Sequence, residues 1–219
     1  MDIDRISKFS KGFYVYYVFL IVGLVLILTF EKGDVLIWIN HNSSSVADIF
    51  FKFWTYLGDG VVFAILLMYF LFSSYYNAVV TLLVILFQTI IVQGMKRFLF
   101  AGEVRPQLYF ENFSDFHQVE GVNIHGLNSF PSGHTATAFA VAILLSLYFK
   151  NNKLTTIFLM AAILVGISRI YLLQHFFIDI YFGSIIGFLV SVGVYYFLDN
   201  SIASKRIPRN HGLLNSRKK

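Results

Sequence analysis

The chain has 219 residues, of which 57% are hydrophobic and only 13% are charged, and its mean hydropathy is +0.69. A soluble globular domain carries about 45–50% apolar and about 25% charged residues. The composition therefore excludes an ordinary soluble domain and predicts an integral membrane protein. The charged residues, with a net charge of +5, cluster between apolar runs, which excludes a nucleic-acid-binding protein. The absence of cysteine excludes disulfides and thiolate metal sites.

Six apolar stretches are long enough, or nearly so, to cross about 30 Å of hydrocarbon as helices. They lie at residues 13–30, 60–73, 78–98, 135–149, 154–172 and 178–198. We therefore expect an all-α fold in which six transmembrane helices form a bundle. Residues 1–200 are predicted to form a single membrane domain, and residues 201–219 a basic, disordered cytoplasmic tail.

The first apolar stretch follows a basic segment with Arg5, Lys8 and Lys11, as the hydrophobic part of a signal peptide does. It is long, however, and the polar residues 31–34 follow it instead of the small residues of a cleavage site. We therefore expect an uncleaved helix.

Basic residues predict the orientation, because the cytoplasmic side of a membrane protein is enriched in lysine and arginine. An even number of spans places both termini on one side, which would then hold 11 of the 17 basic residues. These are Arg5, Lys8, Lys11, Lys150, Lys153, Lys205, Arg206, Arg209, Arg217, Lys218 and Lys219. Both termini are therefore predicted to be cytoplasmic, in the cell (inner) membrane.

The segment between the first two stretches, residues 34–59, mixes apolar residues with Asn, Ser and Asp and contains Trp38 and Trp54. This composition is typical of a short amphipathic helix in the outer interface, with the tryptophans at headgroup depth. A plain polar loop is the alternative.

The longest polar segment, residues 101–131, is expected to cover or shape a site on the outer side, because long loops are often functional. Its ionisable residues include Glu103, Glu111, Asp115, His117, Glu120 and His125.

Three charged segments are predicted to reach the same outer end of the bundle. Ionisable residues at the ends of membrane helices are costly, so each such segment suggests a functional site. The first contains Lys96-Arg97 and, further on, Arg105-Pro106. Taken alone, Lys96 is more simply an anchor whose ammonium reaches the interface.

The second segment, Pro131-Ser132-Gly133-His134, immediately precedes the fourth apolar stretch. Pro131 and Ser132 suit a helix start, and Gly133 lets the backbone N–H groups approach an anion closely. A simple helix cap would need no histidine, although His134 can also be a structural hydrogen-bonding residue.

The third segment contains Ser168-Arg169, His175 and Asp179. His175 and Asp179 are four residues apart, so on a helix they lie on one face within hydrogen-bonding reach. An aspartate placed in this way can fix the imidazole tautomer and so activate a nucleophile. A metal site with two ligands is the competing interpretation, but no further ligands stand at a suitable spacing.

Together the three segments resemble the signature motifs of the type 2 phosphatidic acid phosphatase (PAP2) family, which also includes vanadium-dependent haloperoxidases. The second and third match at every defined position, with five residues between Arg169 and His175 and three between His175 and Asp179. In the first, Lys96 and Arg105 enclose eight residues, two more than is usual, so either Lys96 or Arg97 can fill the lysine position. The apolar spans exclude a soluble haloperoxidase.

The resemblance implies a metal-independent lipid phosphatase without a cofactor, in which residues 1–200 form the catalytic domain. His175, held by Asp179, would attack phosphorus and form a phosphohistidine, and His134 would protonate the departing oxygen and later activate water. Donors from all three motifs would surround the phosphoryl oxygens: Lys96, Arg105, Ser132, Gly133 and Arg169.

The expected partner is a phosphorylated lipid of the outer leaflet, reached from the periplasm or exterior, together with membrane lipids but no nucleic acid. Undecaprenyl pyrophosphate and lipid A phosphates are favoured, and phosphatidylglycerol phosphate or phosphatidate are the other substrates that the resemblance implies. A lipid phosphotransferase using the same phosphohistidine, or a non-catalytic lipid-phosphate binding or transport protein, is the alternative. The oligomeric state does not follow from the sequence.

Overall fold

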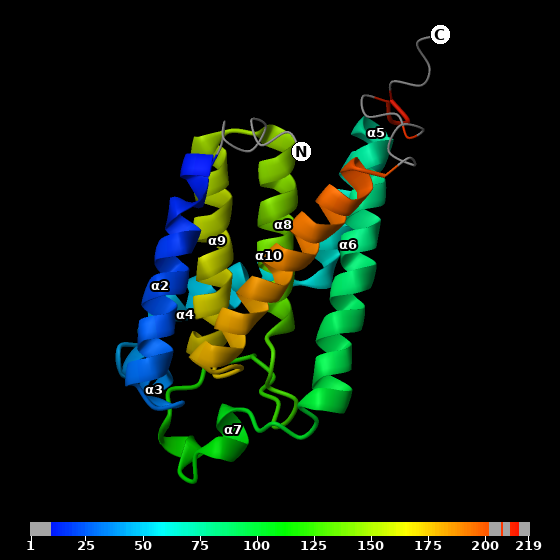
Figure 1. Ribbon diagram of the computed structural model, residues 1–219. Helices are drawn as coiled ribbons and strands as arrows, with labels where there is room; N and C mark the ends of the chain where they lie inside the picture. The colour runs from blue at the N-terminus through cyan, green and yellow to red at the C-terminus, as the bar shows by residue number, and fades with distance from the viewer. Residues whose placement is uncertain (1–9, 202–206, 208–210, 215–219) are drawn as a thin grey trace.

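The computed structural model describes residues 10–201, 207 and 211–214, and in this part of the chain the structure is helical, with one isolated β-bridge between Val104 and Leu127 (Figure 1). The first half of the chain forms η1 (Ser10–Phe13), α2 (Tyr14–Thr29), α3 (Asp34–His41), α4 (Ser45–Trp54), η2 (Thr55–Gly58), α5 (Gly60–Ser73), α6 (Tyr75–Gly94) and η3 (Met95–Leu99). The second half forms α7 (Pro106–Tyr109), η4 (Phe113–Asp115), α8 (Gly133–Phe149), α9 (Asn152–Tyr171) and α10 (Phe177–Asp199).

Each of the six predicted stretches coincides with a helix, namely α2, α5, α6, α8, α9 or α10. Among the described residues, four helices are long and apolar enough to cross a membrane: Ser10–Thr29, Tyr75–Leu99, Asn152–Tyr171 and Phe177–Asp199. Helix α5 is long enough to cross a membrane only if it is counted together with Ser45–Gly58, from which it is bent by 51°. Helix α8 is apolar but shorter than the four spanning helices. The all-α membrane architecture is therefore confirmed, whereas six complete spans are not.

Two short helices, α3 and α4, occupy the region where one interfacial helix was predicted. Helix α4 and η2 pass behind the bundle at about half its height (Figure 1). The indole N–H of Trp54 donates to the carbonyl of Ala161 at 3.1 Å, about halfway along α9. The segment of Trp54 therefore packs into the bundle against α8 and α9, and the predicted headgroup depth of this residue stays a prediction. Trp38, by contrast, is 69% exposed.

Helix α8 is the centre of the bundle, packed against α9 and α10, and 12 of its 17 residues are buried. Small residues allow this close packing. A Cβ atom at Gly183 of α10 would lie 2.6 Å from the carbonyl oxygen of Ser132, and one at Gly187 would lie 2.3 Å from that of Ala136. Such small-residue contacts are typical of membrane helices, and here they hold the start of α8 against the start of α10.

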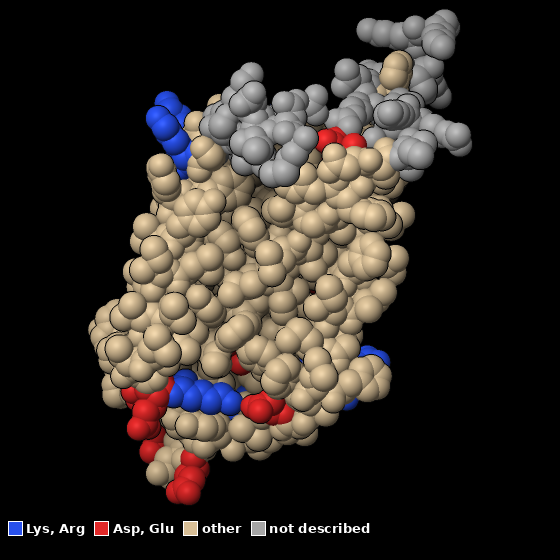
Figure 2. Space-filling view, viewed as in Figure 1, with Lys and Arg blue, Asp and Glu red and all other residues tan. Residues whose placement is uncertain are grey.

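The outer surface of the bundle is apolar along its length. Helices α2, α5 and α6 expose large apolar side chains such as Leu28, Val61 and Ile90. On the face shown in Figure 2, the charged residues gather at the two ends. An apolar band between polar ends suits the hydrocarbon core of a bilayer. Helices also suit this environment, because each one satisfies its own backbone hydrogen bonds.

The start of α2, the α8–α9 connection and the end of α10 lie at one end of the bundle, and α3, α7 and the long loop lie at the other (Figure 1). Most of the predicted tail, residues 201–219, lies outside the described residues. Where it is described, the backbone N–H groups of Leu213 and Leu214 donate to the carbonyls of Leu71 and Phe72 at 3.1 and 3.2 Å. This described part of the tail therefore packs on the end of α5.

Gly187→Ala is expected to destabilise the bundle, because the added methyl group would lie 2.3 Å from a backbone oxygen of α8 and the two helices would have to separate. Overpacking of this kind costs about 1–3 kcal/mol. Gly193→Ala in the same helix is the matched control, since a Cβ atom there meets nothing within 4 Å, and it should be neutral or slightly stabilising. Thermal unfolding in detergent compares the variants, and equal midpoints would contradict the close contact.

Candidate functional site

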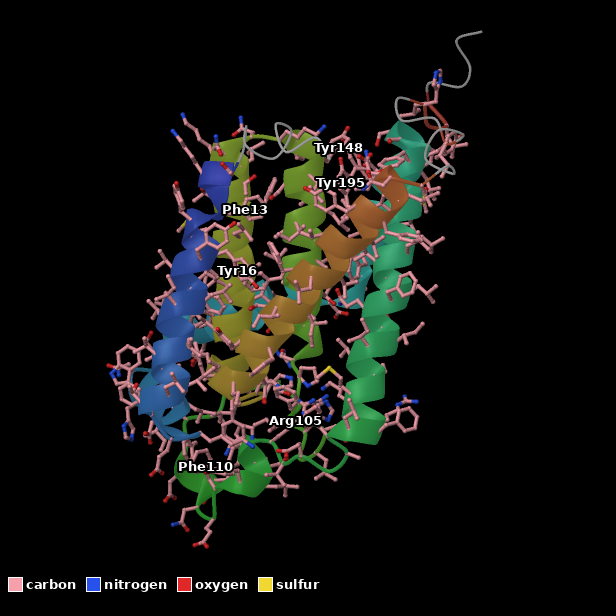
Figure 3. The ribbon with its side chains drawn as sticks, in the orientation of Figure 1. Phe13, Tyr16, Arg105, Phe110, Tyr148 and Tyr195 are labelled. Carbon is pink, nitrogen blue, oxygen red and sulfur yellow. The ribbon has the colours of Figure 1, made fainter. Side chains whose placement is uncertain are left out.

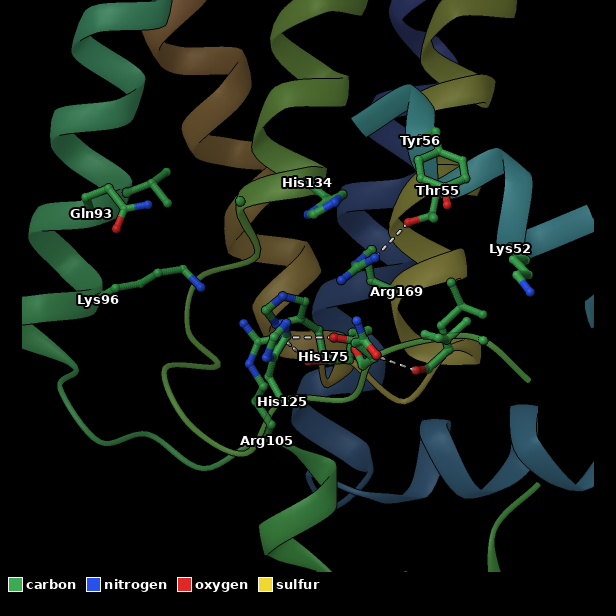
Figure 4. Close-up of a pocket in the computed structure, with 17 residues that line it drawn as sticks. Lys52, Thr55, Tyr56, Gln93, Lys96, Arg105, His125, His134, Arg169 and His175 are labelled. Carbon is green, nitrogen blue, oxygen red and sulfur yellow. Dashed lines mark hydrogen bonds between the residues drawn. The ribbon is translucent and has the colours of Figure 1, made fainter. Parts of the chain in front are cut away.

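At the end of the bundle that carries α3 and α7, a chamber of about 450 Å³ opens between η2, α6, α8, α9 and the long loop (Figure 4). All three predicted charged segments contribute to its wall, and none of the described residues that line it is acidic. Four of its lining residues are Lys or Arg and three are His: Lys52, Lys96, Arg105, Arg169, His125, His134 and His175. A concave site lined by one sign of charge attracts ligands of the opposite sign, so this chamber is suited to an anion.

The turn between α9 and α10 brings Arg169 and His175 together. The backbone N–H groups of Gln174 and His175 both donate to the carbonyl oxygen of Arg169, at 2.9 and 3.1 Å. Leu173 adopts a left-handed φ of 55° within this turn. These backbone hydrogen bonds therefore fold the chain between Arg169 and His175 into a tight turn. Both side chains line the chamber.

His175 and Asp179 form a buried pair. Nδ1 of His175 lies 3.3 Å from Oδ2 of Asp179, and the two side chains are 2% and 1% exposed. The same oxygen accepts from Ser129 Oγ at 2.5 Å and from the backbone N–H of Phe176 at 3.0 Å. These donors fix the carboxylate, and the carboxylate in turn favours the imidazole tautomer with its proton on Nδ1. Nε2 then keeps a free lone pair.

Burial governs the protonation state of His175. Complete removal from water lowers the pKa of His175 to about 3, although the hydrogen bond and charge of Asp179 partly offset this effect. The ring is therefore neutral at physiological pH and is suited to act as a nucleophile or base. Burial also lowers the pKa of Arg105.

The start of α8 forms another wall, where Gly133 and His134 line the chamber. A Cβ atom at Gly133 would meet only Val92, at 3.8 Å. Ser132 is fully buried and does not line the chamber. Its hydroxyl oxygen accepts from the N–H and hydroxyl groups of Thr135 at 3.4 and 2.9 Å, as the N-cap of α8. The structure therefore places Ser132 at the cap of α8, where its hydroxyl orients the helix start, and its contact with phosphate stays a prediction.

The longer first motif still brings Lys96 and Arg105 to one place. Helix α6 ends in the π-helical turn η3, and the chain turns back after it, so the additional residues lie outside the chamber wall. Lys96 Nζ and Arg105 Nη2 both donate to the carbonyl of Asn128, at 2.8 and 3.4 Å. Arg97 is exposed and does not line the chamber. The geometry therefore favours Lys96 over Arg97 for the lysine position.

Two residues that the sequence did not identify hold the arginines. Arg169 Nη1 donates to Thr55 Oγ1 at 2.8 Å. Arg105 Nη1 donates to the backbone and side-chain oxygens of Gln174 at 3.1 and 3.3 Å. Arg169 Nε is buried and meets no acceptor within the described part of the chain. A buried donor without an acceptor is costly, so this N–H is a candidate anion contact.

A metal site with two ligands is the competing interpretation of His175 and Asp179. Among the residues that the structure describes, no group of three or more His, Cys, Asp or Glu side chains could hold a metal ion.

The long loop lines the chamber, as predicted, through His125. Other charged residues of the loop fix it to the rest of the protein. Glu103 pairs with Lys32 at 3.2 Å, and His117 pairs with Asp48 of α4 at 2.9 Å. These two contacts therefore hold the loop over the site. Figure 3 shows the loop below the helices, with Arg105 labelled.

A family model described as the PAP2 superfamily matches residues 77–203, more than half of the chain. Lipid phosphate phosphatase 1 of Arabidopsis thaliana is 36% identical over 119 residues, which covers 43% of this chain and 36% of that protein. The bacitracin transport permease protein BcrC of Bacillus licheniformis is 33% identical over 99 residues, covering 43% and 47%. The chain thus matches less than half the length of these curated relatives.

Two solved structures are also similar. LpxE from Aquifex aeolicus superposes with a TM-score of 0.67 at 29% identity, over 78% of this chain and 98% of that one. A transmembrane PAP2 type phosphatidylglycerolphosphate phosphatase from Bacillus subtilis has a TM-score of 0.50 at 22% identity, over 86% and 96%. The second likeness concerns the fold alone.

The lowered pKa of His175 predicts a pH dependence of stability. Below about pH 6.5 the unfolded chain binds a proton at this residue that the folded chain excludes, so stability is lost as the pH falls. The loss approaches about 1.4 kcal/mol per pH unit for one proton. Between pH 7.5 and 5, the unfolding midpoint of the wild type should therefore fall further than that of His175→Asn. Parallel pH profiles of the two proteins would contradict the burial of a neutral histidine.

Proposed function

The chain belongs to the PAP2 superfamily, and on this premise we propose that it is an integral membrane phosphatase that removes phosphate from a lipid head group through a phosphohistidine intermediate. One observation carries the proposal: a neutral histidine, held by a buried carboxylate, lines a cationic chamber together with a second histidine. His175 provides the nucleophile, and His134 provides the proton donor.

In the proposed first step, Nε2 of His175 attacks phosphorus, and a new P–N bond forms while the bond from phosphorus to the leaving oxygen breaks. That oxygen belongs to the lipid in a monophosphate and bridges to the second phosphoryl group in a diphosphate. His134, in its protonated form, gives its proton to that oxygen. In the second step, neutral His134 takes a proton from water, whose oxygen attacks phosphorus and breaks the P–N bond. Inorganic phosphate leaves and both histidines return to their starting states. Asp179 stabilises the positive charge that develops on His175.

The groups proposed to donate hydrogen bonds to the phosphoryl oxygens are Lys96, Arg105, Arg169 and the backbone N–H of Gly133. The buried Arg169 Nε supports this role, because a phosphoryl oxygen would supply the acceptor that it lacks in the described part of the chain. Ser132 would contribute through the helix cap that orients Gly133. These cations and N–H donors stabilise the transition-state charge in place of a metal ion, so we infer metal-independent catalysis.

The apolar outer surface of the bundle supports a lipid substrate, because a hydrocarbon chain attached to the head group can remain beside it in the bilayer. A cavity of about 190 Å³ between the start of α5 and the end of α6 shares Gly133 and His134 with the chamber. Undecaprenyl pyrophosphate and lipid A phosphates remain the favoured substrates, with phosphatidylglycerol phosphate and phosphatidate as the others. The proposed setting is the cell membrane, with both termini cytoplasmic and the chamber facing the periplasm or exterior.

His175→Asn is expected to lower turnover of these lipids by at least about a thousandfold, because asparagine can still donate to Asp179 but cannot accept a phosphoryl group. His134→Asn should be nearly as severe. Phosphate release by the purified protein in detergent measures both. In the wild type, a quench with labelled substrate should trap an acid-labile phosphoryl group on the protein that His175→Asn lacks.

Three controls accompany these assays. The unfolding midpoint at pH 7.5 shows that each variant is folded. Activity should persist in EDTA, and loss on chelation with recovery on adding a divalent cation would contradict metal independence. A lipid acceptor in the assay tests the phosphotransferase alternative, and lipid binding without phosphate release would indicate the non-catalytic one. Full activity of His175→Asn would overturn the mechanism.

Lys96→Met is expected to lower kcat/KM by about a hundredfold or more, because it removes a cation from the chamber wall. Arg97→Met removes the same charge from the neighbouring exposed position and should change kcat/KM by less than about twofold. The same phosphate-release assay compares the pair. A larger loss with Arg97→Met would reverse the assignment of the lysine position.

A further inference from the structure

Lys52 of α4 lines the same chamber, but the proposed mechanism does not use it. In that mechanism, Lys96, Arg105 and Arg169 contact the one phosphoryl group that reacts. A fourth cation and a volume of about 450 Å³ exceed what a single phosphoryl group requires. The surplus of charge and space therefore indicates a ligand with more anionic groups.

Lys52 lies one helical turn away from the contact that holds Arg169. Thr55, which accepts from Arg169 Nη1 at 2.8 Å, comes three residues after Lys52, and both line the chamber. Residues three apart on a helix are neighbours on one face, with Cβ atoms about 5–6 Å apart. Figure 4 shows Lys52 on the opposite side of Arg169 from Lys96. The chamber wall therefore carries lysines on both sides of Arg169.

The ammonium of Lys52 keeps donors available. Its Nζ donates to the carbonyl of Glu120 at 2.6 Å, and no carboxylate of the described residues lies within ion-pair distance of it. An ammonium has three donors, so the remaining ones can bind a ligand. The adjoining loop residue is Gly121, with a φ of 73°, and a Cβ atom there would lie only 2.9 Å from Nζ. The glycine therefore keeps a side chain away from the ammonium.

We propose that Lys52 forms a second anion subsite, which binds a further phosphoryl group of the lipid head group beside the one that reacts at His175. This inference rests on the proposed function and narrows its substrate class to lipids with two linked phosphoryl groups. The rival role is structural, in which Lys52 only holds the long loop through the carbonyl of Glu120. Loss of a structural contact would change the kinetics of every substrate alike, whereas loss of a subsite changes them only for substrates with the second phosphoryl group.

The kinetic test compares a prenyl diphosphate with the prenyl monophosphate of the same chain length. Lys52→Met should raise KM for the diphosphate about tenfold, the effect of losing one charge-assisted hydrogen bond, while kcat stays within about twofold. KM for the monophosphate should stay within about twofold, and Lys52→Arg should restore most of the diphosphate preference. Arg97→Met is the matched control for loss of one positive charge at an exposed position. Equal changes for both substrates, or no change for either, would overturn the subsite.

A binding test separates this inference from the proposed function. Methylenediphosphonate and methylphosphonate are soluble probes with two and one phosphonate groups, and ligands that bind the folded state raise the unfolding midpoint. The diphosphonate should stabilise the wild type more than the monophosphonate does, and Lys52→Met should remove that difference. If the wild type shows this pattern but hydrolyses neither lipid, the proposed function fails and the subsite stands. If it hydrolyses both and Lys52→Met retains the diphosphonate preference, the subsite fails and the function stands.

Discussion

The chamber depends on one buried carboxylate, that of Asp179. Its Oδ2 accepts hydrogen bonds from Ser129, His175 and the backbone of Phe176, and its backbone carbonyl accepts from the N–H of Ser132. A charged group that leaves water must be fully hydrogen-bonded, or the fold loses several kcal/mol. The donors to the carboxylate come from the long loop and the α9–α10 turn, and the donor to the backbone carbonyl comes from the start of α8. Asp179 therefore links these three segments through its side chain and its backbone together.

Among the described residues, the hydrogen-bond acceptors that position the positive charges of the chamber are neutral groups. Lys96, Arg105 and Lys52 donate to backbone carbonyls, and Arg169 donates to a hydroxyl. Neutral acceptors orient a cation but leave its charge available to a ligand. The nearby carboxylates of Glu103 and Asp48 pair instead with Lys32 and His117, outside the chamber wall. The distribution of partners thus keeps the chamber basic and the loop in place.

The segment formed by α4 and η2 packs into the bundle and also contributes side chains to the chamber. It packs against α8 and α9, and Gly58 allows this approach, since a Cβ atom there would lie 2.6 Å from the carbonyl oxygen of His134. The same segment carries Thr55 and Lys52 into the chamber. Its insertion also explains why α5 is short: the chain enters the bundle partway along it, and α5 continues from that level.

The sequence alone determines the membrane class, the six helices and the convergence of Arg169, His175 and Asp179, because apolar run length and local spacing set these features. Only the tertiary structure decides the depth of α4, since the same amphipathic pattern suits a bilayer interface and a packed groove. Ser129 and Lys52 likewise have no local signal. Their partners lie 50 and 68 residues away in the chain, and packing alone brings such groups together.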